Sequence, residues 1–118
     1  MAGSSLVTAR RHPKGHFEGR RKRGSGRRGE ILAGFLQSDV QADLATARAF
    51  LDEIAATQRG EKPQSGGVGN AFYVAIAPDG AVIRNAVIEG SEPERYSLGE
   101  LEAALEMWVA AIERAGRR

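Results

Sequence analysis

Two runs of aromatic and β-branched residues, joined by Pro78-Asp79-Gly80, constrain the fold of this chain more than any other feature. Proline presets φ for the first central position of a type I turn, aspartate is tolerated at the second, and glycine takes the positive φ of a bulged loop. The segment 70–88 is therefore predicted to form a β-hairpin. One face of its first strand carries Phe72, Val74 and Ile76. The side chains opposite them would be Val82, Ala86 and Ile88 with a three-residue loop, or Ile83 and Val87 with a two-residue loop.

An amphipathic helix is predicted before the hairpin, over about 39–59. Ser38 and Gln41 match a capping box, and Asp39 suits the positive end of the helix dipole. Gly60 can take the left-handed conformation that ends a helix. The apolar stripe of this helix consists of Val40, Leu44, Ala47, Leu51 and Ile54.

A second amphipathic helix is predicted after the hairpin, over about 98–115. Ser97 and Glu100 form a capping box, and Tyr96 can pack on Leu101 as a hydrophobic staple. The apolar stripe consists of Leu98, Leu101, Leu105, Trp108 and Ile112. We expect Trp108 to be buried against the Phe72, Val74 and Ile76 face of the hairpin.

Two further segments complete the predicted fold. The short apolar run 30–36 is interpreted as an edge strand, and the glycine-rich segment 61–70 as a plain connection, because it matches no phosphate-binding motif. The predicted fold class is α+β, a small antiparallel sheet packed by two helices in the order β-α-β-β-α.

The charge is divided unevenly along the chain. Residues 1–30 hold nine basic and two acidic side chains, whereas the other 88 residues hold eight basic and thirteen acidic ones. Residues 1–29 have few large apolar residues and no sustained periodicity, so we expect a disordered basic tail preceding a compact domain over 30–118. The alternatives for this tail are an arm that contacts nucleic acid, a solvated segment without a partner, or translated sequence upstream of the natural start.

Few residues of this chain can carry chemistry. Cysteine is absent, and the two histidines, His12 and His16, lie in a Pro- and Gly-containing stretch that does not favour a helical metal pair. No catalytic, metal or cofactor motif is found, so we expect a non-enzymatic protein without a cofactor. The absence of cysteine and of a 20-residue apolar run fits a soluble, cytoplasmic protein.

Two interaction hypotheses follow from the charges. In the first, acidic residues after the hairpin and on the last helix bind a basic protein; the candidates are Glu89, Glu92, Glu94, Glu100 and Glu106. In the second, the basic tail binds nucleic acid through Arg20, Arg21, Lys22, Arg23, Arg27 and Arg28.

A family resemblance favours the first hypothesis. Gly69-Asn70 opening a strand, an Asp-Gly hairpin turn, an acidic loop, and the helix Ser97-Leu-Gly-Glu-Leu101 with Trp108 resemble small bacterial immunity proteins of polymorphic-toxin systems, and other small bacterial families of the same layout, over about 31–115. The resemblance implies a non-catalytic inhibitor that binds a toxin or nuclease through acidic and aromatic side chains. The basic tail departs from that pattern.

Overall fold

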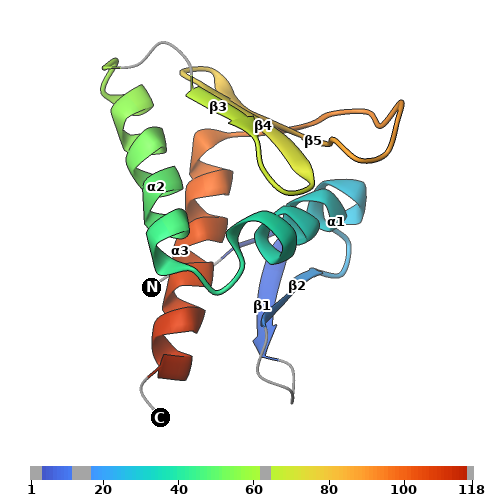
Figure 1. Ribbon diagram of the computed structural model, residues 1–118, viewed down its shortest axis with the longest axis vertical. Helices are drawn as coiled ribbons and strands as arrows, with labels where there is room; N and C mark the ends of the chain where they lie inside the picture. Colours follow the sequence, from blue (N-terminus) through green and yellow to red (C-terminus); the bar gives the residue numbers. More distant parts are fainter. Residues whose placement is uncertain (1–3, 12–16, 62–64, 117–118) are drawn as a thin grey trace.

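Two antiparallel sheets and three α-helices make up the part of the chain that the computed structural model describes, residues 4–11, 17–61 and 65–116 (Figure 1). One sheet has two strands and the other has four, in the order β3-β4-β5-β6. In chain order the elements are β1 (Val7–Arg11), β2 (Phe17–Arg21), α1 (Gly26–Phe35), the π-helical turn η1 (Leu36–Val40), α2 (Leu44–Gln58), β3 (Ser65–Val68), β4 (Phe72–Ala77), β5 (Gly80–Asn85), β6 (Glu94–Tyr96) and α3 (Leu98–Gly116).

The predicted central hairpin is confirmed as β4 and β5. The last residue of β4 pairs with Gly80, so the loop has two residues, and Val74 lies opposite Ile83 on the buried face. Val87, in contrast, follows the end of β5 and is exposed. Gly80 has φ of 143°, and a Cβ there would lie 2.8 Å from the carbonyl oxygen of Tyr96, so the close approach of β6 requires glycine.

Both edges of the four-stranded sheet come from segments that the sequence analysis assigned to loops. β3 lies in the glycine-rich segment 61–70 and pairs with β4, while β6 lies in the acidic segment and pairs with β5. The prediction of a plain connection over 61–70 is therefore wrong for its second half. An edge strand pairs with its neighbour through backbone hydrogen bonds. Glycines can therefore form such a strand although the sequence shows no alternation of apolar and polar side chains.

The start of β4 is held by Asp39. Its carboxylate accepts hydrogen bonds from the backbone N–H groups of Ala71, at 2.9 Å, and Phe72, at 3.1 Å. A Cβ on Gly69 would lie 2.5 Å from this carboxylate, so a side chain at position 69 would prevent the contact. Asp39 thus ties η1 to the sheet and does not serve as a helix-dipole residue.

The last helix begins as the sequence predicts. The Glu100 N–H donates to the Ser97 hydroxyl, and the Ser97 N–H donates to the Glu100 carboxylate, both at 2.9 Å.

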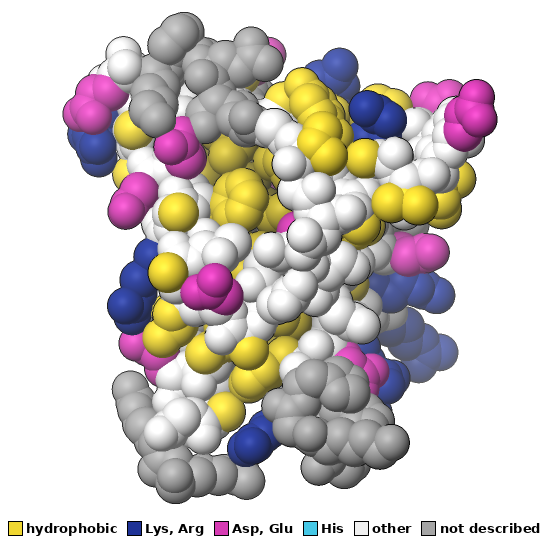
Figure 2. Space-filling model, viewed as in Figure 1, with side chains coloured by type: hydrophobic (Ala, Val, Ile, Leu, Met, Phe, Trp, Pro, Cys, Tyr) yellow, Lys and Arg dark blue, Asp and Glu magenta, His cyan; other side chains and the backbone are white. Residues whose placement is uncertain are grey.

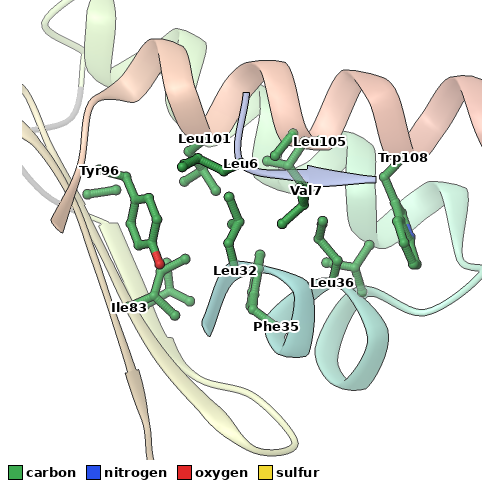
Figure 3. Close-up of a cluster of buried hydrophobic side chains, with 14 of the residues drawn as sticks. Leu6, Val7, Leu32, Phe35, Leu36, Ile83, Tyr96, Leu101, Leu105 and Trp108 are labelled. Carbon is green, nitrogen blue, oxygen red and sulfur yellow. The ribbon is translucent and has the colours of Figure 1, made fainter. Parts of the chain in front are cut away.

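Trp108 is fully buried, which confirms a core position. Its ring lies near that of Phe17, with ring centroids 5.9 Å apart, and its indole N–H donates to the carbonyl oxygen of Gln41 at 2.6 Å. Figure 3 places Trp108 beside Leu36, at the opposite end of the core from Ile83 of the hairpin, so the partners expected for Trp108 were wrong.

The helix predicted over 39–59 starts later and ends as expected. The predicted capping box of Ser38 and Gln41 is wrong. Gln41 has φ of 58°, which is not a helical value, so it ends η1 and does not belong to the first turn of a helix. Asp43 caps α2 instead, accepting from the N–H groups of the first turn. At the other end Gly60 has φ of 76° and the next N–H donates back to Ala56, which is a Schellman motif.

The segment 30–36 is helical, so the predicted edge strand is wrong. Its apolar side chains belong to a longer helical face that begins at Gly29 within the arginine-rich stretch. The buried residues of this face are Gly29, Leu32, Ala33, Phe35 and Leu36, with the spacing of three to four that a helix requires. Seven residues alone were too short to separate this pattern from a strand.

The disorder expected for residues 1–29 does not match the structure either. The segment contains a β-hairpin of β1 and β2 that packs on α1 and α3, and Leu6 and Val7 lie in the core (Figure 3). Gly19 makes this packing possible, because a Cβ there would lie 2.4 Å from the carbonyl oxygen of Ala33. The apolar residues Val7, Ala9 and Phe17 are few, but they share one face, while Arg10 and Arg20 occupy the other. His12 and His16 lie outside the described residues.

Candidate functional site: the loop between β5 and β6

The loop 86–93 projects from the body of the protein between β5 and β6 (Figure 1). Asn85 fixes its beginning, because the Asn85 side-chain oxygen accepts hydrogen bonds from the N–H groups of Val87, at 2.9 Å, and Ile88, at 3.0 Å. This is an Asx turn, in which a side chain replaces a backbone acceptor. A further turn is closed by the Ser91 N–H donating to the Ile88 carbonyl at 3.2 Å.

The end of the loop is held by Arg27 from the first turn of α1. Its guanidinium donates to the carbonyl oxygen of Glu92 at 2.6 Å and forms an ion pair with the Glu94 carboxylate. One arginine thus contacts both the loop and the edge strand that follows it. With Asn85 at the beginning and Arg27 at the end, the loop has a defined conformation although it projects into solvent.

The tip of this loop combines apolar and acidic side chains. Val87 is 72% exposed and Ile88 is 60% exposed, and the only other exposed large hydrophobic residue in the described chain is Val68 on β3. Glu89 and Glu92 are exposed on the same loop. Figure 2 shows hydrophobic and acidic side chains together on this projection. Adjacent exposed apolar side chains can form the apolar centre of a protein contact, and carboxylates around them can form its polar rim.

An open hollow of about 640 Å³ lies between the loop and α1. Ile31 of the helix and Ile88 of the loop form apolar parts of its lining, and Glu30 and Glu92 contribute carboxylates. Arg27 also lines the hollow, so apolar, acidic and basic side chains together connect the loop to the body of the protein.

Beside Arg27, the Arg28 side chain joins α1 to the start of α3. Its guanidinium forms an ion pair with Glu100 at 2.6 Å, donates to the Arg95 carbonyl at 2.9 Å, and lies 5.1 Å from the ring centroid of Tyr96. The Tyr96 hydroxyl donates to the Arg28 carbonyl at 2.6 Å. The hydrogen bond from Arg28, together with that from Ser97, holds the pKa of Glu100 below its usual value, and burial raises the pKa of Tyr96.

The structure divides the acidic residues predicted for partner binding into two groups. Glu94 and Glu100 are engaged by Arg27 and Arg28, which the sequence analysis assigned to nucleic-acid binding. The exposed members are Glu89, Glu92 and Glu106, of which the last lies on α3. Ion pairing between the two predicted sites could not be seen in the sequence, because the partners are 67 and 72 residues apart.

The sequence does not predict the apolar part of the site. It assigned either Val87 or Ile88 to the buried face of the hairpin, depending on the register, whereas both lie beyond β5 and are exposed. A signal was present in Asn85, because asparagine often ends a strand by capping the following turn.

The other predicted basic residues lie at the end of β2 and in its connection to α1. Arg20, Arg21, Lys22 and Arg23 are all exposed. They are consecutive in the sequence and precede the two arginines that are engaged in ion pairs.

The described residues contain no group of three or more His, Asp or Glu side chains that could hold a metal ion. Within the same residues, no helix has the length and apolar character that crossing a membrane requires. Comparison of the chain with protein-family models, with curated proteins and with solved structures gives no match.

Proposed function

We propose that this protein is a non-catalytic binding domain that contacts a basic protein through the loop 86–93. The observation that carries the proposal is the exposure of Val87 and Ile88 beside Glu89 and Glu92, on a loop whose two ends are fixed. Apolar side chains supply the buried area of such a contact, and carboxylates select a positively charged partner.

The rigidity of the loop supports this function. A loop that already holds its bound conformation loses less conformational entropy on binding than a flexible one, so more of the contact energy becomes affinity. The hydrogen bonds from Arg27 and to Asn85 provide that order without using the exposed side chains.

The proposed biological role is inhibition of a basic toxin or nuclease. The resemblance to small immunity proteins supports this role, and the separation of charge in the structure fits it, because the acidic loop and the basic hairpin lie on different elements. Electrostatic steering would then orient the partner toward the loop and increase the association rate.

The test compares the intact protein with a loop variant in native lysate. The loop variant is Val87→Ser, Ile88→Ser, Glu89→Gln and Glu92→Gln, all at exposed positions, so the fold should be retained. The control variant is Asp52→Asn and Asp79→Asn, which makes the same change in charge at two exposed positions outside the loop 86–93. We expect the wild type and the control to capture one basic protein that the loop variant does not capture.

The association rate of the purified pair should also fall as salt is raised, because the Debye length shortens from about 10 Å at 0.1 M to about 3 Å at 1 M. Capture of the same proteins by the wild type and the loop variant would contradict the proposal. A captured partner with an acidic surface would contradict the electrostatic part of it.

A further inference from the structure

The β1–β2 hairpin carries a strongly basic surface that the proposed function does not use. Thr8 pairs with Arg20 and Arg10 pairs with Glu18, so these four side chains share the face that is turned away from the core. The opposite face carries Val7, Ala9, Phe17 and Gly19 toward the helices, and Arg11 and Arg21 lie exposed at the ends of this face. Lys22 and Arg23, in the connection from β2 to α1, are exposed as well. The exposed residues Arg10, Arg20, Arg21, Lys22 and Arg23 are here named the basic surface.

The basic surface differs from the rest of the protein in how its charges are balanced. Elsewhere four described arginines have a carboxylate partner: Arg27 and Arg28 pair with Glu94 and Glu100, Arg48 with Glu113 at 3.0 Å, and Arg59 with Glu61 at 2.6 Å. Among the residues that the structure describes, no hydrogen bond or ion pair involves the side chains of Arg21, Lys22 and Arg23, and Arg20 has only a 3.5 Å contact with Glu18. In Figure 2 dark blue side chains gather at the right, level with β2 and the start of α1. Adjacent unbalanced cations repel one another, and a polyanion would remove that repulsion.

From this arrangement we propose that the basic surface binds the phosphate backbone of a nucleic acid. Four of its five residues are arginines, whose planar guanidinium groups bind phosphate through two parallel hydrogen bonds. The apolar residues of the hairpin face the core, so this side offers no apolar wedge for insertion into a lipid surface. The five residues include no aromatic ring on which a base could stack, so binding reads phosphates and not sequence.

The structure also removes two residues from the site that the sequence predicts. Arg27 and Arg28 are held by Glu94 and Glu100, so they support the fold and the loop 86–93. A phosphate contact requires a guanidinium group without a carboxylate partner, which Arg21 and Arg23 provide. The site therefore lies on the β1–β2 hairpin and on the connection from β2 to α1, and it does not include the first turn of α1.

The test measures the fluorescence anisotropy of three labelled probes of equal length: duplex DNA, duplex RNA and single-stranded RNA. If about four phosphates are neutralised, the logarithm of affinity for duplex DNA should fall with the logarithm of salt concentration with a slope of about −3.6. Raising salt from 50 to 200 mM should then weaken binding by about 150-fold. Binding should not depend on the base sequence of the probe.

The test variant is Arg21→Gln, Lys22→Gln and Arg23→Gln, and the control is Arg48→Gln, Arg59→Gln and Arg95→Gln, which removes the same charge at other exposed positions. The measured quantity is the slope of the logarithm of affinity against the logarithm of salt concentration. We expect the test variant to reduce the magnitude of this slope by about 2.7, and the control to leave it nearly unchanged. Circular dichroism and the fluorescence of the single tryptophan, Trp108, verify the fold of both variants.

Three outcomes would overturn the inference: no binding of any probe at 50 mM salt, equal losses in the test and control variants, or binding to vesicles of phosphatidylserine and phosphatidylcholine without binding to duplex probes. Because the loop 86–93 is unchanged in these variants, capture of a basic protein through that loop is tested separately.

Discussion

The N-terminal hairpin should contribute strongly to stability, which the Leu6→Ala substitution tests most directly. Leu6 is 6% exposed and packs in the core with Val7 and Leu32. The substitution removes three carbon atoms, at about 0.8 kcal/mol each by transfer, and leaves a cavity, so the free energy of unfolding should fall by about 2–5 kcal/mol. Val7→Ala removes two carbon atoms from a fully buried side chain and should cost about 1.5–3 kcal/mol.

Urea unfolding monitored by the fluorescence of Trp108 is the appropriate assay. Trp108 is the only tryptophan, is fully buried, and lies 5.9 Å from Phe17 of β2, so its emission reports on the packing of this hairpin. Thr8→Ala is the matched control, because Thr8 lies on the exposed face of the same strand, and it should change stability by less than about 0.5 kcal/mol.

Deletion of residues 1–22 extends the same test. It removes both buried side chains and uncovers Leu32 and Trp108, so the transition should shift to much lower urea or lose cooperativity. If Leu6→Ala and the deletion both leave the midpoint within the error of the control, the hairpin does not pack on α1 and α3, and the reasoning is refuted.

Three further predictions follow from other contacts. Gly19→Ala should destabilise by about 1–3 kcal/mol in thermal unfolding, because its Cβ would lie 2.4 Å from a backbone oxygen of α1; an unchanged Tm would contradict this packing. The ion pair with Arg28 lowers the pKa of Glu100 in the folded state. The pair therefore stabilises the fold at pH values above about 4.3, the pKa of a glutamate in the unfolded chain. This stabilisation is lost as the pH falls through the pKa of Glu100 in the folded state. Glu100→Gln should flatten the decline in stability below pH 5, and an unchanged acid profile would argue against the pair. Trp108→Phe removes the hydrogen bond to the Gln41 carbonyl and should cost about 1–3 kcal/mol by circular dichroism, whereas a neutral result would show that water replaces the indole N–H.

The sequence alone determined the elements whose signals are local. The hairpin of β4 and β5 follows from its turn residues and strand pattern, and α3 follows from the capping box of Ser97 and Glu100 with its apolar stripe. The end of α2 at Gly60 also follows from a local signal, because glycine readily takes the positive φ that ends a helix. Each of these signals depends on residues within a few positions of one another, so no knowledge of distant contacts is needed.

The tertiary structure decided the elements whose stability comes from distant partners. β1 and β2 are strands because one sparse apolar face meets α1 and α3, although their arginine content favours disorder. β3 has no side-chain pattern at all, because backbone pairing with β4 defines it.

The candidate sites show the same division. The sequence predicts Glu89, Glu92 and Arg20–Arg23 as candidates, and the structure shows that these side chains are exposed. Only the fold revealed that Arg27 and Arg28 form ion pairs with Glu94 and Glu100. Which charges remain free for a partner depends on ion pairs between residues far apart in the chain, because electrostatic interactions act through space and not along the sequence.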